Sequence, residues 1–419
     1  MYMKKLVTLF LISFSLFAFS QSRKEIGNDF IKTLFIEKNA VKAHSYFDPS
    51  IAGELKAADL TAVTEQIKEN LGSFKNILEV NSEKDSYYYY SEFDKSKLDM
   101  LITFNDGNKI IGFVFVPHKT FDRADDKTFL KIKSDDIELN GTLLIPEQDN
   151  KKKLVIFVHG SGPQDRDETL GENKPFKDIA EALFKNGITS YRYDKRTYSY
   201  PETFTEQSTV EQETISDAVN AAAYFKNNES FKGYQIIILG HSLGAYLMPE
   251  IAKKANASKY IFMAGNARPL QDLIVEQLEY IRKVDPSKAP EQFLDTTKKQ
   301  VSLLNSDRFS LTTPTSELPM GLSAPYWNYL LHYKPLDEVK NIKAPMFFAQ
   351  GGRDYQVTGK DFGLWKNQLK NNKNAVFHLY PSLNHLFIKG SGVPAPKDYE
   401  IKGNVDQEFL NDLIQFVLK

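Results

Sequence analysis

Cysteine is absent from this 419-residue sequence, and its absence excludes several kinds of site. Without a thiol the chain forms no disulfide, no thiolate metal site and no lipid attachment at a cysteine. A charge excess of either sign is also missing, since 53 basic and 54 acidic residues leave a net charge of -1 at pH 7. This balance argues against nucleic acid as a main partner. The apolar fraction of 42% is that of an ordinary globular protein with a substantial core.

Long apolar runs are scarce as well, and the one at the amino terminus is too short for a membrane anchor. Lys4 and Lys5 precede the largely apolar stretch 6–19, and Ala18-Phe19-Ser20 puts small residues at the positions that a signal peptidase reads. A membrane-spanning helix needs about 20 apolar residues, whereas this pattern is typical of a signal peptide. We therefore expect residues 1–20 to be cleaved before Gln21. The mature protein is then periplasmic or secreted from a bacterium, with no stable membrane anchor.

Residues 21–118 are predicted to form a small α+β domain. Apolar residues at helical spacing come first. Two alternating stretches follow, 98–104 and 111–115, and the turn between them indicates a hairpin. No set of residues in this region suggests catalysis, so its role stays open. One hypothesis is attachment to a cell-envelope partner.

The charged stretch 119–127 is the predicted linker to a catalytic domain, 128–419. There, strand patterns alternate with helical patterns over short connections, which is typical of a mostly parallel sheet with helices on both faces. Between about 265 and 340 the alternation stops, and helical segments with a loop rich in proline and aromatic residues intervene. We expect an α/β fold in which this insertion forms a helical cap. Four aromatic residues of the cap either line an acyl pocket or pack the cap onto the sheet: Tyr326, Trp327, Tyr329 and Tyr333.

The sequence Gly240-His241-Ser242-Leu243-Gly244 lies between an apolar run and a helical pattern. The run suits a parallel strand buried on both faces. G-x-S-x-G at such a strand-to-helix turn is typical of a nucleophile elbow. Its glycines remove the Cβ atoms that would clash in the tight turn. Ser242 is therefore the predicted nucleophile.

The loop 159–163, His-Gly-Ser-Gly-Pro, follows a second buried-strand pattern. Attack on an acyl bond places negative charge on the carbonyl oxygen, and losing one N–H donor that stabilises it costs roughly 10²–10³ in rate. One donor is the residue after the nucleophile, here Leu243, and the other comes from the loop after this earlier strand. By position the second donor is Ser161, with Gly162 as the alternative.

A serine hydroxyl needs a base, normally a histidine that a carboxylate orients. The sequence has seven histidines, and His385 is the one that follows the last strand pattern, at the sheet edge where ligands bind in open α/β folds. Asp354 also stands just past a strand pattern. Ser242, Asp354 and His385 follow one another in the chain order that accompanies a nucleophile elbow. We predict these three residues as a catalytic triad.

With these motifs, the region from about 125 to 419 resembles the α/β-hydrolase superfamily, in the branch of serine aminopeptidase-like hydrolases and bacterial carboxylesterases. The resemblance rests on residues 159–167, 240–244, 352–354 and 384–385. Within the first of these, Asp165, Arg166 and Asp167 match the branch, and an ion-pair network that braces the loop accounts for them.

Two further segments carry a resemblance. Asp194-Lys195-Arg196 resembles the D-K-R-G segment of the same hydrolases, with Thr197 in place of the glycine. The amino-terminal region resembles the small, nuclear-transport-factor-like domain of unknown function that precedes such hydrolases in many bacterial secreted proteins. That resemblance rests on the order of helix, helix and hairpin and on the residues from Lys97-Leu98-Asp99 through Val116-Pro117.

The sequence thus predicts a secreted serine hydrolase that cleaves a small-molecule carboxylic ester through an acyl-enzyme intermediate. Neither a metal nor an organic cofactor is expected. A serine peptidase or amidase with the same triad is the main alternative, and a non-catalytic binding protein on a hydrolase scaffold is another. Activity is expected to fall at acid pH as His385 becomes protonated.

Overall fold

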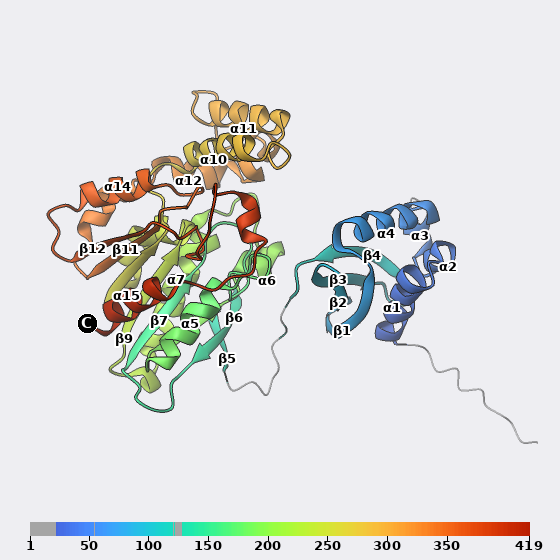
Figure 1. Cartoon of the computed structure of the whole chain (residues 1–419), viewed down its shortest axis with the longest axis horizontal. Helices are drawn as coiled ribbons and strands as arrows, with labels where there is room; N and C mark the ends of the chain where they lie inside the picture. Colours follow the sequence, from blue (N-terminus) through green and yellow to red (C-terminus); the bar gives the residue numbers. More distant parts are fainter. Residues whose placement is uncertain (1–21, 54, 120, 122–127) are drawn as a thin grey trace, which may run out of the picture. The chain divides into compact units, whose positions relative to one another are not determined.

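The computed structural model describes residues 22–53, 55–119, 121 and 128–419. The predicted signal peptide and most of the predicted linker lie outside these residues. The chain divides into two compact units, residues 1–122 and 123–419, both drawn in Figure 1. Within the described ranges, no helix is long and apolar enough to cross a membrane.

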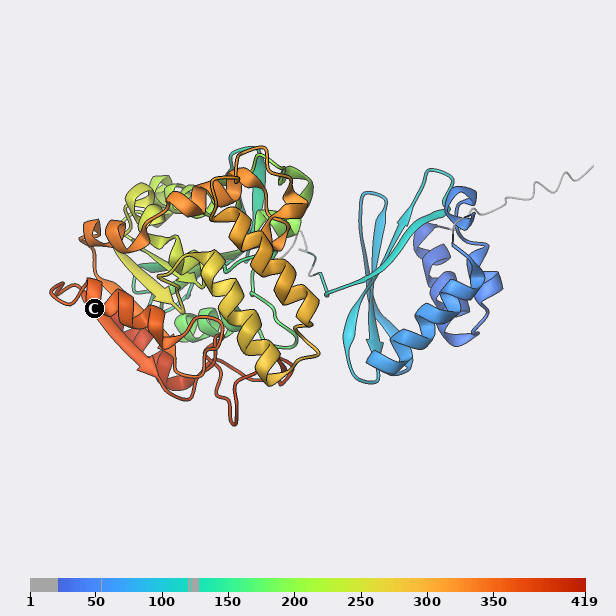
Figure 2. The ribbon, with the colours of Figure 1, turned by 90° about the horizontal axis from the view of Figure 1, so that it is seen from above.

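The first unit is a four-stranded antiparallel sheet with helices on one face (Figure 2). Its elements are α1 Arg23–Ile31, a π-helical turn Lys32–Ile36, α2 Ala40–His44, α3 Pro49–Ala52, α4 Ala57–Leu71, β1 Phe74–Glu83, β2 Ser86–Phe93, β3 Lys97–Phe104 and β4 Ile110–Val116. The strands lie in chain order across the sheet. The predicted hairpin is confirmed as β3 and β4, in which Ile102 pairs with Phe113. Phe30, Leu34 and Met100 are buried between the helices and the sheet.

The second unit is built on an eight-stranded sheet. Its strands are β5 Phe129–Ser134, β6 Ile137–Leu144, β7 Lys153–Val158, β8 Thr189–Tyr193, β9 Gln235–His241, β10 Lys259–Met263, β11 Met346–Gly351 and β12 Ala375–Tyr380. Their order across the sheet is β12-β11-β10-β9-β7-β8-β6-β5. All pairs from β12 to β8 are parallel, whereas β6 and β5 run antiparallel to their neighbours. The mostly parallel sheet predicted from the alternation is confirmed.

Helices cover both faces of this sheet. They are α5 Pro175–Lys185, α6 Arg196–Ser199, a π-helical turn Glu211–Ile215, α7 Ser216–Asn227, α8 Leu243–Tyr246, α9 Met248–Ala255, α14 Gly359–Gln368 and α15 Gln407–Leu418. On one face α5 and α15 bury Phe176 and Phe409 against the strands, and Figure 1 shows these two helices in front of the sheet. On the other face α9 and α14 contribute Ile251 and Trp365. Both faces of the central strands are therefore buried, which explains their unbroken apolar sequence.

A helical insertion separates β10 from β11. It comprises α10 Leu270–Val284, α11 Glu291–Leu304, α12 Ala324–His332 and α13 Pro335–Glu338. The pair α10 and α11 stands beyond one end of the strands in Figure 1 and lies in the foreground of Figure 2. Because the chain enters the insertion from the carboxyl end of β10, the insertion lies at the edge of the sheet where β7, β9 and β11 also end. The predicted site residues belong to loops at that edge.

Candidate active site

Ser242 occupies a strained turn between β9 and α8. Its backbone has φ 50° and ψ -114°, a positive φ that a residue with a side chain rarely adopts. The two glycines of the motif permit this turn, because a Cβ on Gly240 would lie 2.5 Å from the carbonyl carbon of Gly244. A Cβ on Gly244 would lie 2.5 Å from the carbonyl oxygen of Val158 in β7. The nucleophile-elbow geometry predicted from the sequence is therefore present.

His385 and Asp354 meet at the same edge of the sheet. The Nδ1 of His385 lies 2.7 Å from Oδ2 of Asp354, and the two side chains are 6% and 0% exposed. Asp354 follows β11 and His385 follows β12, so neighbouring parallel strands bring together residues that are 31 positions apart. Since a carboxylate only accepts hydrogen bonds, Nδ1 of His385 carries the proton and Nε2 is left as the basic nitrogen.

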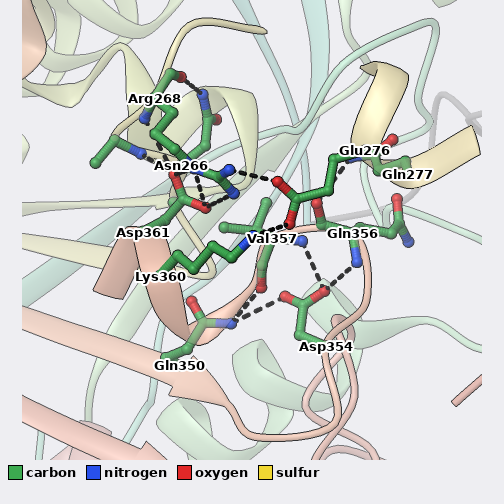
Figure 3. A network of polar contacts seen from close by, with 12 residues as sticks. Asn266, Arg268, Glu276, Gln277, Gln350, Asp354, Gln356, Val357, Lys360 and Asp361 are labelled. Atoms are coloured by element: carbon green, nitrogen blue, oxygen red, sulfur yellow. Dashed lines mark hydrogen bonds and ion pairs between the residues drawn. The ribbon is translucent and has the colours of Figure 1, made fainter. Parts of the chain in front are cut away.

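The Asp354 carboxylate is held by three further donors (Figure 3). The backbone N–H groups of Gln356 and Val357 donate to Oδ1 over 2.8 and 2.9 Å. The side-chain amide of Gln350 donates to Oδ2 over 3.1 Å. Gln277 of α10 donates to the carbonyl oxygen of Gln356 over 2.9 Å, which ties the insertion to this loop. The orientation of the carboxylate is thus fixed before any substrate binds.

His241 connects the elbow to the His385 loop. Its Nε2 donates to the carbonyl oxygen of His385 over 3.0 Å, and the two imidazole rings lie 4.5 Å apart. Its Nδ1 lies 2.8 Å from the buried carboxylate of Glu168. Burial by itself lowers the pKa of His241, but the Glu168 carboxylate more than offsets this and raises that pKa above its usual value. Both ring nitrogens of His241 thus contact groups other than Ser242, and the side chain joins two loops.

Glu168 also reaches the predicted oxyanion loop. Its Oε1 accepts a hydrogen bond of 2.7 Å from the N–H of Gly160. Burial acts to raise the pKa of Glu168, but the neighbouring His241 outweighs it and holds the pKa below its usual range. A Cβ on Gly160 would lie 3.2 Å from Cβ of Ser242, so this loop passes directly beside the predicted nucleophile. No role for Glu168 is predicted from the sequence, where it is one of three acids in the charged run 165–168.

His159, at the start of the same loop, is buried and neutral. Its Nε2 donates to the carbonyl oxygen of Asp165 over 2.9 Å. Burial lowers the pKa of His159 to about 4. The next residues, Ser161 and Gly162, lie at the surface of the loop, and Gly162 adopts a φ of 80° that favours glycine. Leu243, the other predicted donor, begins α8 immediately after Ser242.

The three charged residues after β8 each pair with a different buried partner. Arg166 donates to both oxygens of Asp194, over 3.1 and 2.6 Å. Arg196 donates to both oxygens of Asp217, over 3.0 and 2.6 Å. Lys195 pairs with Glu213 and also donates to the carbonyl oxygen of Gly160 in the oxyanion loop.

The predicted ion-pair network around 165–167 is confirmed in part. Arg166 pairs with Asp194, and Asp167 pairs with Arg192 and Lys174. Asp165 instead accepts hydrogen bonds from the backbone N–H and the hydroxyl of Thr169, at 2.9 and 2.6 Å. The network therefore braces the segment that carries both His159 and Glu168.

The aromatic residues of the insertion pack inward for the most part. Tyr326, Trp327 and Tyr333 are buried, and Tyr333 donates from its hydroxyl to the carbonyl oxygen of Tyr246 over 3.0 Å. Tyr326 donates to Glu213 over 2.5 Å, and Tyr329 is partly exposed. The contacts of Tyr326 and Tyr333 therefore agree with the alternative in which these residues pack the cap onto the sheet. Among the described residues, no group of three or more histidine, aspartate and glutamate side chains is placed to hold a metal ion.

Comparison with known proteins agrees with this architecture. Residues 155–389, more than half of the chain, match the alpha/beta hydrolase family. The chain is also 32% identical over 384 residues to esterase EstD of Thermotoga maritima, a match that covers 88% of this chain and 89% of EstD. The chain belongs to the alpha/beta hydrolase family. The predicted fold class and family are therefore confirmed.

The first unit of this alpha/beta hydrolase matches a different family. Residues 29–113 correspond to a family described as a protein of unknown function (DUF3887). The predicted separate small domain ahead of the hydrolase is thus present, and the match assigns no activity to it.

Solved structures of similar hydrolases are more distant in sequence. An esterase of Pyrococcus furiosus, Pf2001, is 18% identical, with coverage of 69% of this chain and 89% of that chain at a TM-score of 0.44. Est1E of Butyrivibrio proteoclasticus is 17% identical, with coverage of 70% and 96% at a TM-score of 0.44.

Proposed function

We propose that this protein is an esterase that cleaves small-molecule carboxylic esters with the triad Ser242, His385 and Asp354. The observation that carries the proposal is the buried contact of 2.7 Å between His385 and Asp354 at the sheet edge that also bears the strained Ser242. The family relationship to esterase EstD supports an ester as the substrate.

The chemistry follows from these positions. Nε2 of His385 takes the proton of the Ser242 hydroxyl as its oxygen attacks the ester carbonyl. The same nitrogen then returns the proton to the leaving alcohol, which leaves an acyl-enzyme. Water, activated in the same way, releases the acid. Asp354 holds the imidazole in the tautomer that this cycle requires and stabilises the imidazolium that forms.

The backbone N–H groups of Leu243 and Ser161 are assigned to the oxyanion of each tetrahedral intermediate. Leu243 directly follows the nucleophile, and the loop that bears Ser161 passes beside Ser242 through Gly160. Two preorganised donors in a partly buried site stabilise the developing charge more strongly than water does.

The decisive experiment compares ester hydrolysis by the wild type, Ser242→Ala and His385→Ala on a chain-length series of p-nitrophenyl esters. We expect each substitution to lower kcat by about 10⁴-fold or more. His378→Ala is the matched control, because His378 also pairs with an aspartate, Asp412, over 2.6 Å, but it is half exposed and lies within β12 rather than in a loop. The control is expected to retain wild-type activity.

The same assay on aminoacyl p-nitroanilides separates ester from amide substrates. Faster serine-dependent cleavage of the anilides would assign the protein as a peptidase instead. Absence of any turnover that depends on Ser242 would overturn the catalytic proposal and favour a binding role.

We also propose that the protein is exported after cleavage before Gln21. The charged start, short apolar run and small residues of 1–20 support this proposal. Amino-terminal sequencing of the protein from a bacterial periplasmic fraction tests it, and a mature chain that retains Met1 would refute it.

The first unit is proposed to attach the enzyme to a cell-envelope partner. Its match to a family without assigned activity leaves room for such a role. A chain that starts near Lys127 should then keep ester hydrolysis and lose retention on isolated envelopes. Loss of hydrolysis in that chain would instead indicate that the first unit shapes the active site.

A further inference from the structure

Lys195 is a buried lysine that the proposed reaction does not use. It lies two positions beyond the end of β8, and its side chain is 2% exposed. Its Nζ donates to the carbonyl oxygen of Gly160 over 2.7 Å and to Oε1 of Glu213 over 2.5 Å. A buried charge is costly unless it is paired and hydrogen-bonded. The free-energy cost of burying this charge suggests that Lys195 has a function.

The carbonyl that Lys195 contacts belongs to the same peptide unit as the N–H of Ser161. A peptide unit is planar and trans, so its C=O and N–H point in opposite directions. A donor fixed on the Gly160 oxygen therefore fixes the direction of the Ser161 N–H. The inference rests on the proposed function, in which this N–H stabilises the oxyanion.

The charge of Lys195 acts in addition to its position. Hydrogen bonds in a chain polarise one another, and burial strengthens the effect because the local dielectric constant is low. An ammonium on the carbonyl oxygen draws electron density from the peptide nitrogen and makes its N–H a stronger donor. Gly160 is also held on its other side, where its own N–H donates to Glu168 over 2.7 Å. The two peptide units on either side of the Gly160 Cα are thus each held by a buried charged side chain, the first by Glu168 and the second by Lys195.

Lys195 is itself connected to the insertion, through Glu213 and Tyr326. Glu213 accepts from Lys195 with Oε1 and from the hydroxyl of Tyr326 with Oε2, each over 2.5 Å. Burial raises the pKa of Tyr326 well above its usual value, so this hydroxyl remains a donor at neutral pH. Tyr326 lies on α12, and the contact therefore runs from the insertion through Glu213 and Lys195 to the peptide at Gly160.

We propose that Lys195 is a positioning residue for the oxyanion hole, which orients and polarises the Gly160–Ser161 peptide under the control of Glu213 and Tyr326. It does not touch the substrate. Its contribution appears only when negative charge develops on the carbonyl oxygen, so it should affect kcat more than KM.

The test compares matched oxygen and thiono esters, which differ only in the carbonyl atom. Sulfur accepts hydrogen bonds poorly, so a thiono ester gains little from an oxyanion donor. The variant is the double substitution Lys195→Met with Glu213→Gln, which removes both buried charges together. We expect kcat for the oxygen ester to fall about 10- to 100-fold, less than the loss of a whole donor. The thiono ester rate should change by less than about 3-fold, with KM for both nearly unchanged.

Arg196→Met with Asp217→Asn is the matched control. This adjacent pair is also buried, with two hydrogen bonds between its partners, and within the described residues it has no hydrogen bond or ion pair with the oxyanion loop. A general loss of packing or stability should affect both double variants alike. Only the Lys195 variant should lower the ratio of oxygen to thiono ester rates.

Tyr326→Phe probes the connection to the insertion and removes a single hydroxyl. We expect a smaller fall in the same ratio, about 2- to 5-fold. This fall should vanish when Tyr326→Phe is added to the Lys195 double variant, because the two changes act through one contact. Additive effects would limit the positioning role to Lys195 and overturn the part assigned to Tyr326.

Each outcome decides between the two proposals. Equal losses on both esters, or an unchanged ratio, in an enzyme that still depends on Ser242 overturns the role of Lys195 alone. Turnover that persists in Ser242→Ala overturns the proposed function, and the inference falls with it.

Discussion

His241 Nδ1 lies 2.8 Å from the Glu168 carboxylate, and this buried pair joins three loops of the active site. Glu168 accepts from Gly160 in the oxyanion loop, and His241 donates to the carbonyl oxygen of His385. Nε2 of His241 donates to a carbonyl while Nδ1 faces a carboxylate, and the Glu168 carboxylate raises the pKa of His241, which favours the positively charged ring. The residue beside Ser242 therefore has a structural position that joins these loops.

Glu168→Gln tests this pair through the pH dependence of stability. The raised pKa of His241 gives stability that is full below about pH 6.5, the unfolded value, and is lost as pH rises through the higher folded pKa. The lowered pKa of Glu168 gives stability above about pH 4.5 that is lost on acidification. The variant should therefore be less stable than wild type by about 3 kcal/mol between pH 5 and 6.5, and by less at pH 9.

Calorimetric melting of the hydrolase unit across pH 4.5–9 measures this difference. Glu279→Gln is the control, since Glu279 forms a half-exposed ion pair with Lys298 and its loss should matter little. A difference between wild type and Glu168→Gln that does not change with pH would show that His241 is neutral in the folded protein.

Asp354→Asn isolates the orienting role of the carboxylate. An amide of the same shape keeps the packing but offers an N–H toward Nδ1 of His385, which favours the tautomer protonated on the wrong nitrogen. We expect kcat to fall about 10⁴-fold with KM little changed. Asp412→Asn is the matched control, because Asp412 pairs in the same way with His378 outside the site. A loss below about 10-fold would assign the orienting role to another group.

Gly244→Ala tests the close approach of the elbow to β7. The added Cβ would lie 2.5 and 2.7 Å from the carbonyl oxygens of Val158 and His159, which are backbone atoms with little freedom to move. We expect a loss of about 1–3 kcal/mol in stability from overpacking, together with lower kcat because the oxyanion loop is displaced.

Gly363→Ala is the control for this substitution, because an added Cβ at Gly363 has room. Gly363 lies within α14 with nothing within 4 Å of an added Cβ. Alanine there should stabilise the protein by about 0.5–1 kcal/mol. Both melting temperatures are measured together, and a neutral Gly244→Ala would show that the turn relaxes without cost.

The sequence predicts the fold best where local pattern and tertiary burial agree. The hairpin of β3 and β4 and the mostly parallel sheet were both predicted, because alternating apolar residues and apolar runs mark their strands. The π-helical turn before α7 was not predicted. This turn carries Glu213, whose contact with Lys195 leaves no trace in the periodicity of the sequence.

The residues of the candidate site were likewise predicted only in part. Ser242, Asp354 and His385 were predicted because chain order and strand ends suffice to place them. Glu168 and Lys195 were missed, although both contact Gly160, because a buried charge is indistinguishable from a surface charge until its partner is known. Lys195 lies 35 positions from Gly160, and only the neighbouring positions of β7 and β8 in the sheet bring the two together.

His159→Gln tests the neutral state of the buried histidine at the start of the oxyanion loop. Burial is the main cause of its low pKa, to which the ammonium of Lys195 adds, while Glu168 and Asp194 act in the opposite direction. The unfolded chain binds a proton near pH 6.5 and the folded chain only near pH 4, so folded stability is complete above pH 6.5 and falls as the solution is acidified. This single group should cost about 3 kcal/mol by pH 4.

Glutamine keeps an amide donor for the carbonyl oxygen of Asp165 but does not titrate. The melting temperature of the variant should therefore fall less steeply than that of wild type between pH 6.5 and 4. Identical slopes would mean that His159 is protonated without cost, and would place its imidazole in contact with water rather than inside the loop.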